Sequence, residues 1–129
     1  MKRKQEDRQL TRAEMEVMSI LWDCGKGMTT HEIIEQYPEP KPAYSTIATF
    51  LKILINKGFL GSRKLEGGGK TLVFHPLMTR DEYTNRVMKE VKSTFFGNSL
   101  KSMLSFFAKH EEVSEEDLKE IMEMISSNK

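Results

Sequence analysis

The stretch AYSTIATFLKILINKGF, residues 43–59, has the pattern of one amphipathic helix. Gly58 directly follows Lys57, as expected of a left-handed C-terminal cap preceded by a cation in the last turn. The apolar side chains recur at intervals of three and four residues, which places them on a single face. They are Ile47, Phe50, Leu51, Leu54 and Ile55.

The opposite face of this helix carries short, polar or cationic residues, namely Ser45, Ala48, Thr49, Lys52 and Asn56. Hydroxyls and a lysine, without a carboxylate, suit a helix that lies against phosphates and reaches base edges in the major groove of DNA. Ordinary surface helices share such a pattern, so the flanking sequence has to decide between these two interpretations.

The preceding residues predict two shorter helices. LTRAEMEVMSILWD, residues 10–23, begins with Thr11 and Glu14 at the spacing of a capping box. Thr29 and Glu32 repeat that spacing ahead of a second helix, and a proline-rich segment then excludes further helix before residue 43.

The residues that follow predict a hairpin. Residues 59–65 and 70–75 are β-compatible and flank Glu66 with a run of three glycines. A glycine-rich loop beside cations also suggests a nucleotide-binding P-loop, but the strand–loop–helix context and the Lys-Ser/Thr pair are missing. Three helices followed by a basic hairpin is the order of a winged helix-turn-helix domain. The cations of the hairpin are Arg63, Lys64 and Lys70.

From Thr79 onward the pattern is helical throughout. Thr79 with Glu82, and Ser114 with Asp117, have the spacing of helix caps, and a Gly-Asn pair at 97–98 interrupts the helices. Three short helices make a poor core alone, so we expect their apolar stripes to pack against a second copy of the chain; packing onto residues 1–78 is the alternative. The expected interface residues are Tyr83, Val87, Val91, Phe95, Leu100, Met103, Leu104, Phe107, Leu118, Ile121, Met122 and Ile125.

The distribution of charge supports two domains. The 129 residues carry a net charge of +1, but residues 1–78 hold 12 basic against 9 acidic side chains, and residues 79–129 hold 8 against 10. Such asymmetry suggests different partners for the two halves. We therefore predict a mainly α fold, with a winged-helix DNA-binding domain over 1–78 and an all-helical dimerisation domain over 79–129.

Cofactors, catalysis and membrane insertion have no support in the sequence. The single cysteine, Cys24, fits a reducing compartment, and no apolar run reaches membrane-spanning length, which predicts a cytoplasmic protein. His31, His75 and His110 are scattered without metal-ligand spacing, and no nucleophile lies beside a base. We expect no metal, no cofactor, no enzymatic activity, and a partly buried Cys24 thiol rather than a redox sensor.

Four stretches together resemble a known family. LTRAEMEVMSILW, STIATFLKILINKGFL, the basic hairpin and NSLKSMLSFF with VSEEDLKEIMEMI are similar to the penicillinase and methicillin-resistance repressors of the BlaI/MecI type. The resemblance covers nearly the whole chain from Leu10. It implies a homodimeric winged-helix repressor that binds a dyad-symmetric operator, in the setting of antibiotic resistance. Copper-responsive relatives carry paired cysteines near the C-terminus, which this chain lacks.

This interpretation assigns the DNA-binding residues. The third helix would read the groove, although relatives often carry a basic side chain at the position of Ala48, so base specificity differs. Solvation alone is the alternative role for each cation. A protein-interaction adaptor is the competing class of function, but a basic wing and a hydroxyl-rich third helix favour DNA. The candidate residues are Ser45, Thr46, Ala48, Thr49 and Lys52 on the helix, with Lys41, Arg63, Lys64 and Lys70 for phosphates.

The resemblance also implies a route of induction. In this family a membrane sensor with a metalloprotease domain triggers cleavage of the repressor within its dimer module, between an Asn and a Phe. The corresponding pair here is Phe106-Phe107, so the Asn is missing. A role for both side chains as interface core is the favoured alternative. Cleavage at this pair would remove the last helix and weaken the dimer.

Overall fold

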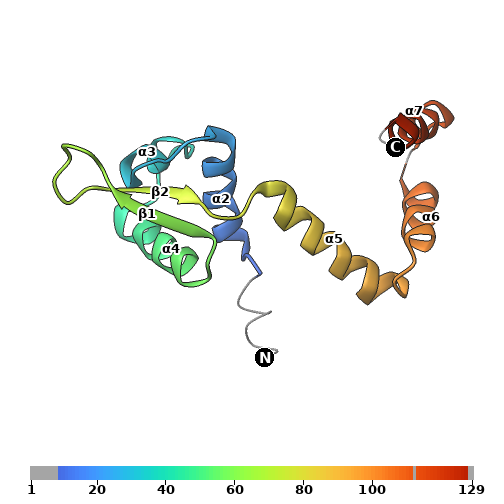
Figure 1. The fold of residues 1–129 in the computed structure, drawn as a ribbon, viewed down its shortest axis with the longest axis horizontal. Helices are drawn as coiled ribbons and strands as arrows, with labels where there is room; N and C mark the ends of the chain where they lie inside the picture. Colours follow the sequence, from blue (N-terminus) through green and yellow to red (C-terminus); the bar gives the residue numbers. More distant parts are fainter. Residues whose placement is uncertain (1–8, 112, 128–129) are drawn as a thin grey trace. The chain divides into compact units, whose positions relative to one another are not determined.

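The computed structural model of the protein describes residues 9–111 and 113–127 (Figure 1). Contacts divide the chain into two compact units, one that ends at Tyr83 and one formed by the residues after it. The sequence-based boundary lay after residue 78. The first turn of helix α5 (Arg80–Phe96) therefore belongs to the first unit.

Helix α2 (Arg12–Cys24) begins with the predicted capping box. The hydroxyl oxygen of Thr11 accepts a hydrogen bond from the Glu14 N–H at 3.2 Å, and the Glu14 carboxylate accepts one from the Thr11 N–H at 3.0 Å. These two bonds satisfy two of the N–H groups that the first turn of a helix leaves without partners. The helix ends at Gly25, whose φ of 76° is left-handed.

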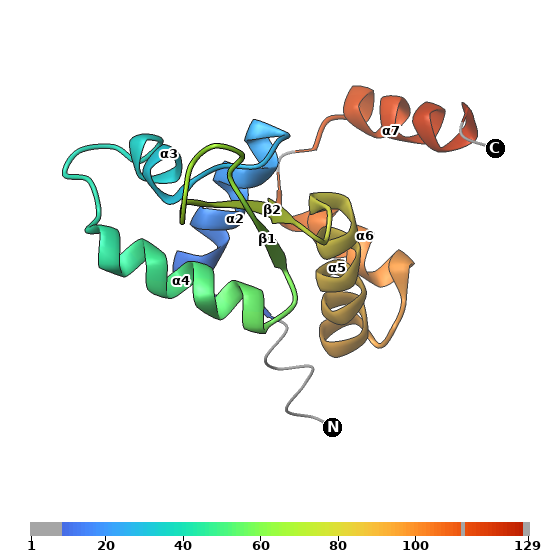
Figure 2. The same ribbon diagram turned by 60° about the vertical axis from the view of Figure 1, so that its left-hand side comes forward.

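Helix α3 (Thr30–Glu35) repeats this arrangement. Thr29 accepts from the Glu32 N–H at 3.2 Å, and the Glu32 carboxylate accepts from the Thr29 N–H at 2.8 Å, which confirms the second capping box. The proline-rich loop after α3 stands out from the helices before the chain enters α4 (Figure 2). Lys41 anchors this loop by donating hydrogen bonds to the carbonyl oxygens of Glu35 and Tyr37 at 3.0 and 2.8 Å.

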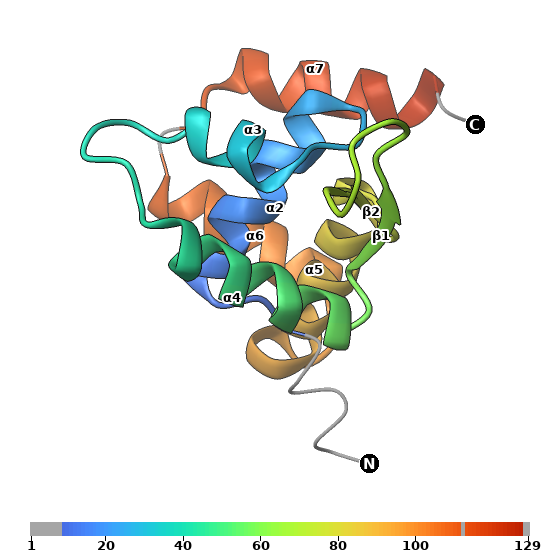
Figure 3. The same ribbon diagram turned by 90° about the vertical axis from the view of Figure 1, so that its left-hand side faces the viewer.

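Helix α4 (Tyr44–Asn56) packs against both α2 and α3 (Figure 3). Its predicted stripe is buried at Ile47, Leu51 and Leu54, while Phe50 is half-buried. Ile55 departs from the prediction, because 36% of its side chain is exposed. Ile55 lies at the last turn of α4, where it lines a groove that opens toward the hairpin.

The two strands form the predicted hairpin. β1 (Leu60–Lys64) pairs antiparallel with β2 (Leu72–Pro76), with Leu60 opposite Pro76 and Lys64 opposite Leu72. The Leu65 N–H donates to the Thr71 carbonyl oxygen at 2.8 Å and closes the ladder below the glycine-rich tip. The tip extends beyond the three helices and forms the wing (Figure 1).

The loop between α2 and α3 adds a short third pairing to this sheet. The Met28 N–H donates to the Phe74 carbonyl oxygen at 2.9 Å, and the Phe74 N–H donates back at 2.8 Å. Gly27 permits this close approach, since a Cβ at that position would lie 2.5 Å from Val73 Cγ1. The bridge ties the wing to the helices, and no local pattern in the sequence predicts it.

Tyr83 belongs to the core of the first unit, where only 6% of its side chain is exposed. Its hydroxyl oxygen accepts a hydrogen bond from the Leu10 N–H at 2.9 Å, and its ring meets Phe59 edge-on with centroids 5.5 Å apart. Trp22 packs beside it and donates from Nε1 to the Met78 carbonyl oxygen at 2.9 Å. The assignment of Tyr83 to a dimer interface is therefore corrected, because the side chain is already enclosed within its own unit.

The second unit contains the rest of α5, α6 (Leu100–His110) and α7 (Glu115–Ser127). Gly97 and Asn98 have φ values of 55° and 64°, which places the predicted break between α5 and α6 in left-handed backbone.

The predicted capping residues begin these helices. The hydroxyl oxygens of Thr79 and Ser114 each accept from the N–H three residues ahead, in both cases at 3.0 Å. Ser99 caps α6 in the same way at 3.1 Å. In the part of the chain that the structure describes, α7 buries no residue, and no helix is long and apolar enough to cross a membrane.

Candidate nucleic-acid interface

The outward face of α4 carries the residues that were predicted from the sequence to contact DNA. Ser45, Thr46, Thr49 and Lys52 are exposed, and Ala48 is half-buried between them and the core. The Thr49 hydroxyl donates to the Ser45 carbonyl oxygen at 2.9 Å, so its methyl group and its acceptor lone pairs remain for a partner. The face has no carboxylate that would repel a phosphate.

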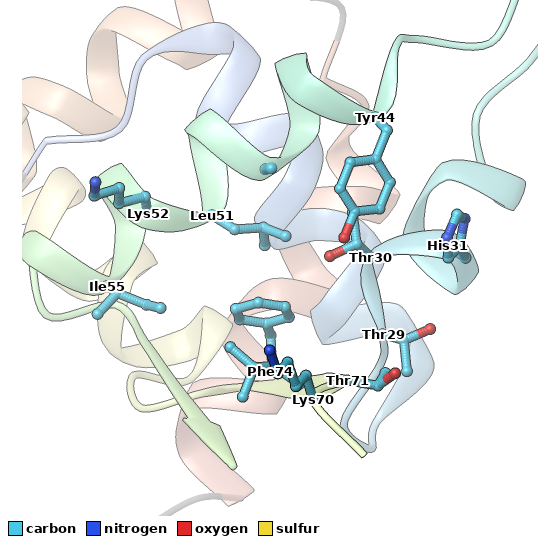
Figure 4. A pocket seen from close by; sticks show the side chains of 12 residues that line it. Thr29, Thr30, His31, Tyr44, Leu51, Lys52, Ile55, Lys70, Thr71 and Phe74 are labelled. Carbon is cyan, nitrogen blue, oxygen red and sulfur yellow. The ribbon is translucent and has the colours of Figure 1, made fainter. Parts of the chain in front are cut away.

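A groove of about 560 Å³ separates this helix from the wing and from the start of α3 (Figure 4). Lys52 on α4 and Lys70 at the base of the wing tip are the charged side chains of its lining, and no acidic residue contributes to it. Two cations without a carboxylate give the lining a positive charge, which favours the binding of anions. The lining consists of Thr29, Thr30, His31, Tyr44, Ala48, Leu51, Lys52, Ile55, Lys70, Thr71, Leu72 and Phe74.

The other cations of the sequence-based set lie outside the groove. Arg63 and Lys64 are exposed neighbours on β1, so they point to opposite faces of the wing. Lys41 is half-buried, and its ammonium group is occupied by the two carbonyl oxygens at the end of α3. The structure thus brings Ala48, Lys52 and Lys70 together in one groove and gives Lys41 a role within the fold.

Two groove residues were missed in the sequence analysis. Tyr44, the first residue of α4, is 53% exposed, and its ring lies against His31 of α3 with centroids 5.0 Å apart and planes at 44°. Tyr44 could have been found from the sequence, because it is an aromatic residue at the start of the helix that was predicted to contact DNA. Nothing local in the sequence indicates that His31 lies beside it.

An ion pair connects the C-terminal end of α4 to α2. Lys57 Nζ, at the end of α4, lies 2.7 Å from the Glu14 carboxylate on α2 and also donates to the Gln9 carbonyl oxygen at 3.0 Å. Burial by itself would raise the pKa of Glu14, but hydrogen bonds from Lys57 and Thr11, together with the charge of Lys57, hold that pKa below its ordinary value. The capping-box spacing predicted the contact of Glu14 with Thr11, whereas no sequence pattern predicted its contact with Lys57.

The second unit exposes a large apolar surface on α5, α6 and α7. Val87 and Val91 are half-buried, and Met103 is buried within the unit at 7% exposure. Apart from Tyr83, the remaining predicted interface residues are all between 42% and 73% exposed in the single chain. These exposed residues are Phe95, Leu100, Leu104, Phe107, Leu118, Ile121, Met122 and Ile125.

The Phe106-Phe107 pair lies within α6, and both side chains are partly exposed, at 45% and 42%. The Phe106 ring meets Phe96 edge-on at 5.6 Å and stacks on His110 at 4.2 Å. His110 Nδ1 lies 2.8 Å from the Phe106 carbonyl oxygen. Phe106 therefore joins Phe96, Phe107 and His110 in a cluster of contacting rings.

Within residues 9–111 and 113–127, side chains with metal-binding chemistry do not cluster. Among the residues that the structure describes, no group of three His, Cys, Asp or Glu side chains could hold a metal ion. Cys24 is exposed, in contrast to the partial burial expected from sequence, and it is the last residue of α2, directly before the cap at Gly25.

Three helices followed by an antiparallel wing, with the third helix carrying an outward polar face, define the winged helix-turn-helix class. Residues 10–127 match the penicillinase repressor family, and the chain belongs to this family. Membership makes it a transcriptional regulator of the repressor type.

Individual relatives agree with this assignment. The chain is 27% identical to the penicillinase repressor of Bacillus licheniformis over 122 residues, which cover 94% of this chain and 92% of the relative. It is 24% identical to the methicillin resistance regulatory protein MecI of Staphylococcus aureus over 119 residues, covering 92% and 94% of the two chains. The penicillinase repressor of Staphylococcus aureus is also 24% identical over 119 residues, covering 92% and 91%.

Proposed function

We propose that the protein is a homodimeric repressor that binds a dyad-symmetric operator through α4 and the wing. The groove carries this proposal, because it combines the carboxylate-free face of α4 with Lys52 and Lys70 on facing walls. Hydroxyls and lysines supply the hydrogen bonds to phosphate that set the register of a protein on duplex DNA, and side chains on the outer face of α4 reach base edges. Arg63 and Lys64 add one positive charge to each face of the wing.

The exposed apolar surface of the second unit supports a second copy of the chain as its partner. α7 spans 13 residues and buries none of its described side chains, and a helix of that length is marginal in water without tertiary packing. A two-fold dimer covers the same patch on both chains and requires no other protein. We place Phe95, Leu104, Phe107, Leu118 and Ile121 in this interface, with the other exposed residues of α6 and α7.

Two-fold symmetry determines the form of the operator. A dimer presents two copies of α4, so two half-sites should lie about one helical turn apart, roughly 34–36 Å, or a multiple of it. A repressor bound across a promoter excludes RNA polymerase, and transcription stops.

Relief of repression by proteolysis is the second part of the proposal. Cleavage at Phe106-Phe107 by a protease that depends on a membrane sensor would separate the end of α6 and all of α7 from the rest of the chain, and with them most of the exposed large apolar side chains of these two helices. The peptide bond lies within a helix, so α6 has to unwind before an extended segment can enter a protease site. Mass spectrometry of fragments after incubation with the cognate protease tests this step, and an intact chain under inducing conditions would contradict it.

The DNA-binding step is tested by selection from a pool of random duplexes, followed by band-shift titration of the enriched site at several salt concentrations. The proposal predicts a recovered palindrome, retained binding over competitor DNA and an affinity that falls steeply with salt as counterions are released. A protein-interaction adaptor would enrich no site and would show no such salt dependence.

A further inference from the structure

Tyr44 and His31 form a pair of exposed rings at one end of the groove, and neither belongs to the residues assigned so far. We propose that Tyr44 is a further operator contact, with its hydroxyl donating a hydrogen bond to a phosphate oxygen, and that His31 is the residue that positions it. This inference rests on the proposed function, because the partner it names is the operator.

The hydroxyl of Tyr44 is available for such a bond. The side chain is 53% exposed, and within residues 9–111 and 113–127 its oxygen has no hydrogen-bond partner. The ring extends from the start of α4 into the groove rather than away from the domain (Figure 4). An exposed phenol directed into a groove lined by lysines is placed for an anion and adds nothing to the packing of the core.

The position of Tyr44 and His31 in the fold favours a phosphate as the group that Tyr44 contacts. In a helix-turn-helix the first helix crosses the DNA backbone while the N-terminal residues of the second approach the groove. Tyr44 is the first residue of α4, and His31 is the second residue of α3, so the two rings lie where those two helices begin. Tyrosine is among the side chains that donate to phosphate oxygens, and bases stacked in a duplex offer it no face.

His31 restrains the Tyr44 ring before DNA arrives. Ring centroids 5.0 Å apart with planes at 44° are within the range of favourable aromatic contacts. A side chain already held in one rotamer loses less conformational entropy when it binds. His31 therefore acts through Tyr44, and its ring shape matters more than its ring nitrogens.

A double-mutant cycle on the selected operator separates these roles. Tyr44→Phe keeps the ring and removes only the hydroxyl, so affinity should fall about tenfold per half-site, the effect of one hydrogen bond to a charged group. His31→Ala should cost a similar factor, and Tyr44→Phe should then cost little more in that background. His31→Phe, which preserves the ring contact, should restore affinity to within about twofold of the unmodified chain.

Tyr37→Phe is the matched control, because Tyr37 lies in the same unit, is half-buried and does not line the groove. It should leave affinity unchanged. The slope of affinity against salt should also stay the same in Tyr44→Phe, since the lost donor is neutral.

The outcomes distinguish this contact from the proposed function. Unchanged affinity in Tyr44→Phe, or an equal loss in Tyr37→Phe, would overturn the contact while operator binding stands. Additive losses for His31→Ala and Tyr44→Phe would overturn the positioning role of His31. Failure of the unmodified chain to enrich any DNA site would overturn the proposed function and this contact with it.

Discussion

Glu14 on α2 is only 4% exposed, and its carboxylate forms an ion pair with Lys57 at the end of α4. The two residues are 43 positions apart in the chain, so this pair fixes α4 relative to α2. Because Lys57 and Thr11 hold the pKa of Glu14 below its ordinary value of 4.5, the ionised form is favoured in the folded state.

Glu14→Gln should lower the free energy of unfolding at pH 7 by about 1–3 kcal/mol, since Gln can still accept the Thr11 N–H but removes the negative charge that lies 2.7 Å from the Lys57 ammonium group. The contribution of the ionised carboxylate is fully present above pH 4.5, the ordinary value, and is lost as the pH falls through the lower folded-state pKa. Urea unfolding at pH 7 and pH 3 measures both effects. A difference between the two proteins that grew toward pH 3 would contradict this account.

Lys52 and Lys41 should differ in what their loss affects: DNA binding for Lys52 and stability for Lys41. Lys52→Met removes a charge that lines the groove, so the slope of log affinity against log salt should become shallower by about 0.9 per protomer without loss of stability. Lys41→Met removes two bonds to carbonyl oxygens and should cost about 1–2 kcal/mol of stability. Band shifts at several salt concentrations and thermal melts on both variants measure these effects. A loss of stability in Lys52→Met together with a shallower salt slope in Lys41→Met would contradict the assignment.

At the scale of the elements, Gly27 determines how closely the wing docks on the helices. A Cβ there would lie 2.5 Å from the buried Val73 side chain and 3.4 Å from the Phe74 carbonyl oxygen. Gly27→Ala should therefore destabilise the first unit by about 1–3 kcal/mol through overpacking. Gly58→Ala is the comparison, because open space surrounds Gly58 and only its φ of 87° disfavours a side chain, at about 1 kcal/mol. Chemical denaturation of the two variants should rank Gly27→Ala as the more damaging.

The elements themselves could be predicted because their signals are local. Both capping boxes, the left-handed Gly58 and the break at Gly97 depend on residues within four positions of one another, and the structure confirms each. The hairpin was predicted for the same reason, since a glycine-rich tip separates two β-compatible runs.

The errors arose where distant segments meet. The bridge of Met28 to Phe74 and the enclosure of Tyr83 by Phe59 join residues that no periodicity connects. Ile55 was assigned to the core because helical spacing gives the face of a helix but not how far its neighbours extend. Within the candidate interface, Lys52 and Lys70 were predicted, whereas the contact of His31 with Tyr44 depends on the angle at which α3 and α4 meet.

At the scale of the whole molecule, the apolar stripe of α7 should hold two chains together. Ile121→Glu places a charge in that stripe on both copies, and the lost burial, at 1.5 kcal/mol or more per copy, should raise the dimer dissociation constant about a hundredfold. Ser127→Glu adds the same charge on the opposite side of the helix and should leave the dimer intact. Sedimentation equilibrium measures both, and an unchanged mass for Ile121→Glu would assign the stripe to another partner.

The central claim is that two linked chains present two reading helices to one duplex. Band-shift titration against the selected operator, with its half-sites separated by inserts of 5 and 10 base pairs, tests this claim directly. We predict that affinity drops with 5 added pairs, which rotate one half-site by about half a turn, and recovers at least partly with 10, which restore the face of the helix. Equal affinity for all three duplexes would show that each chain binds alone and would contradict the account.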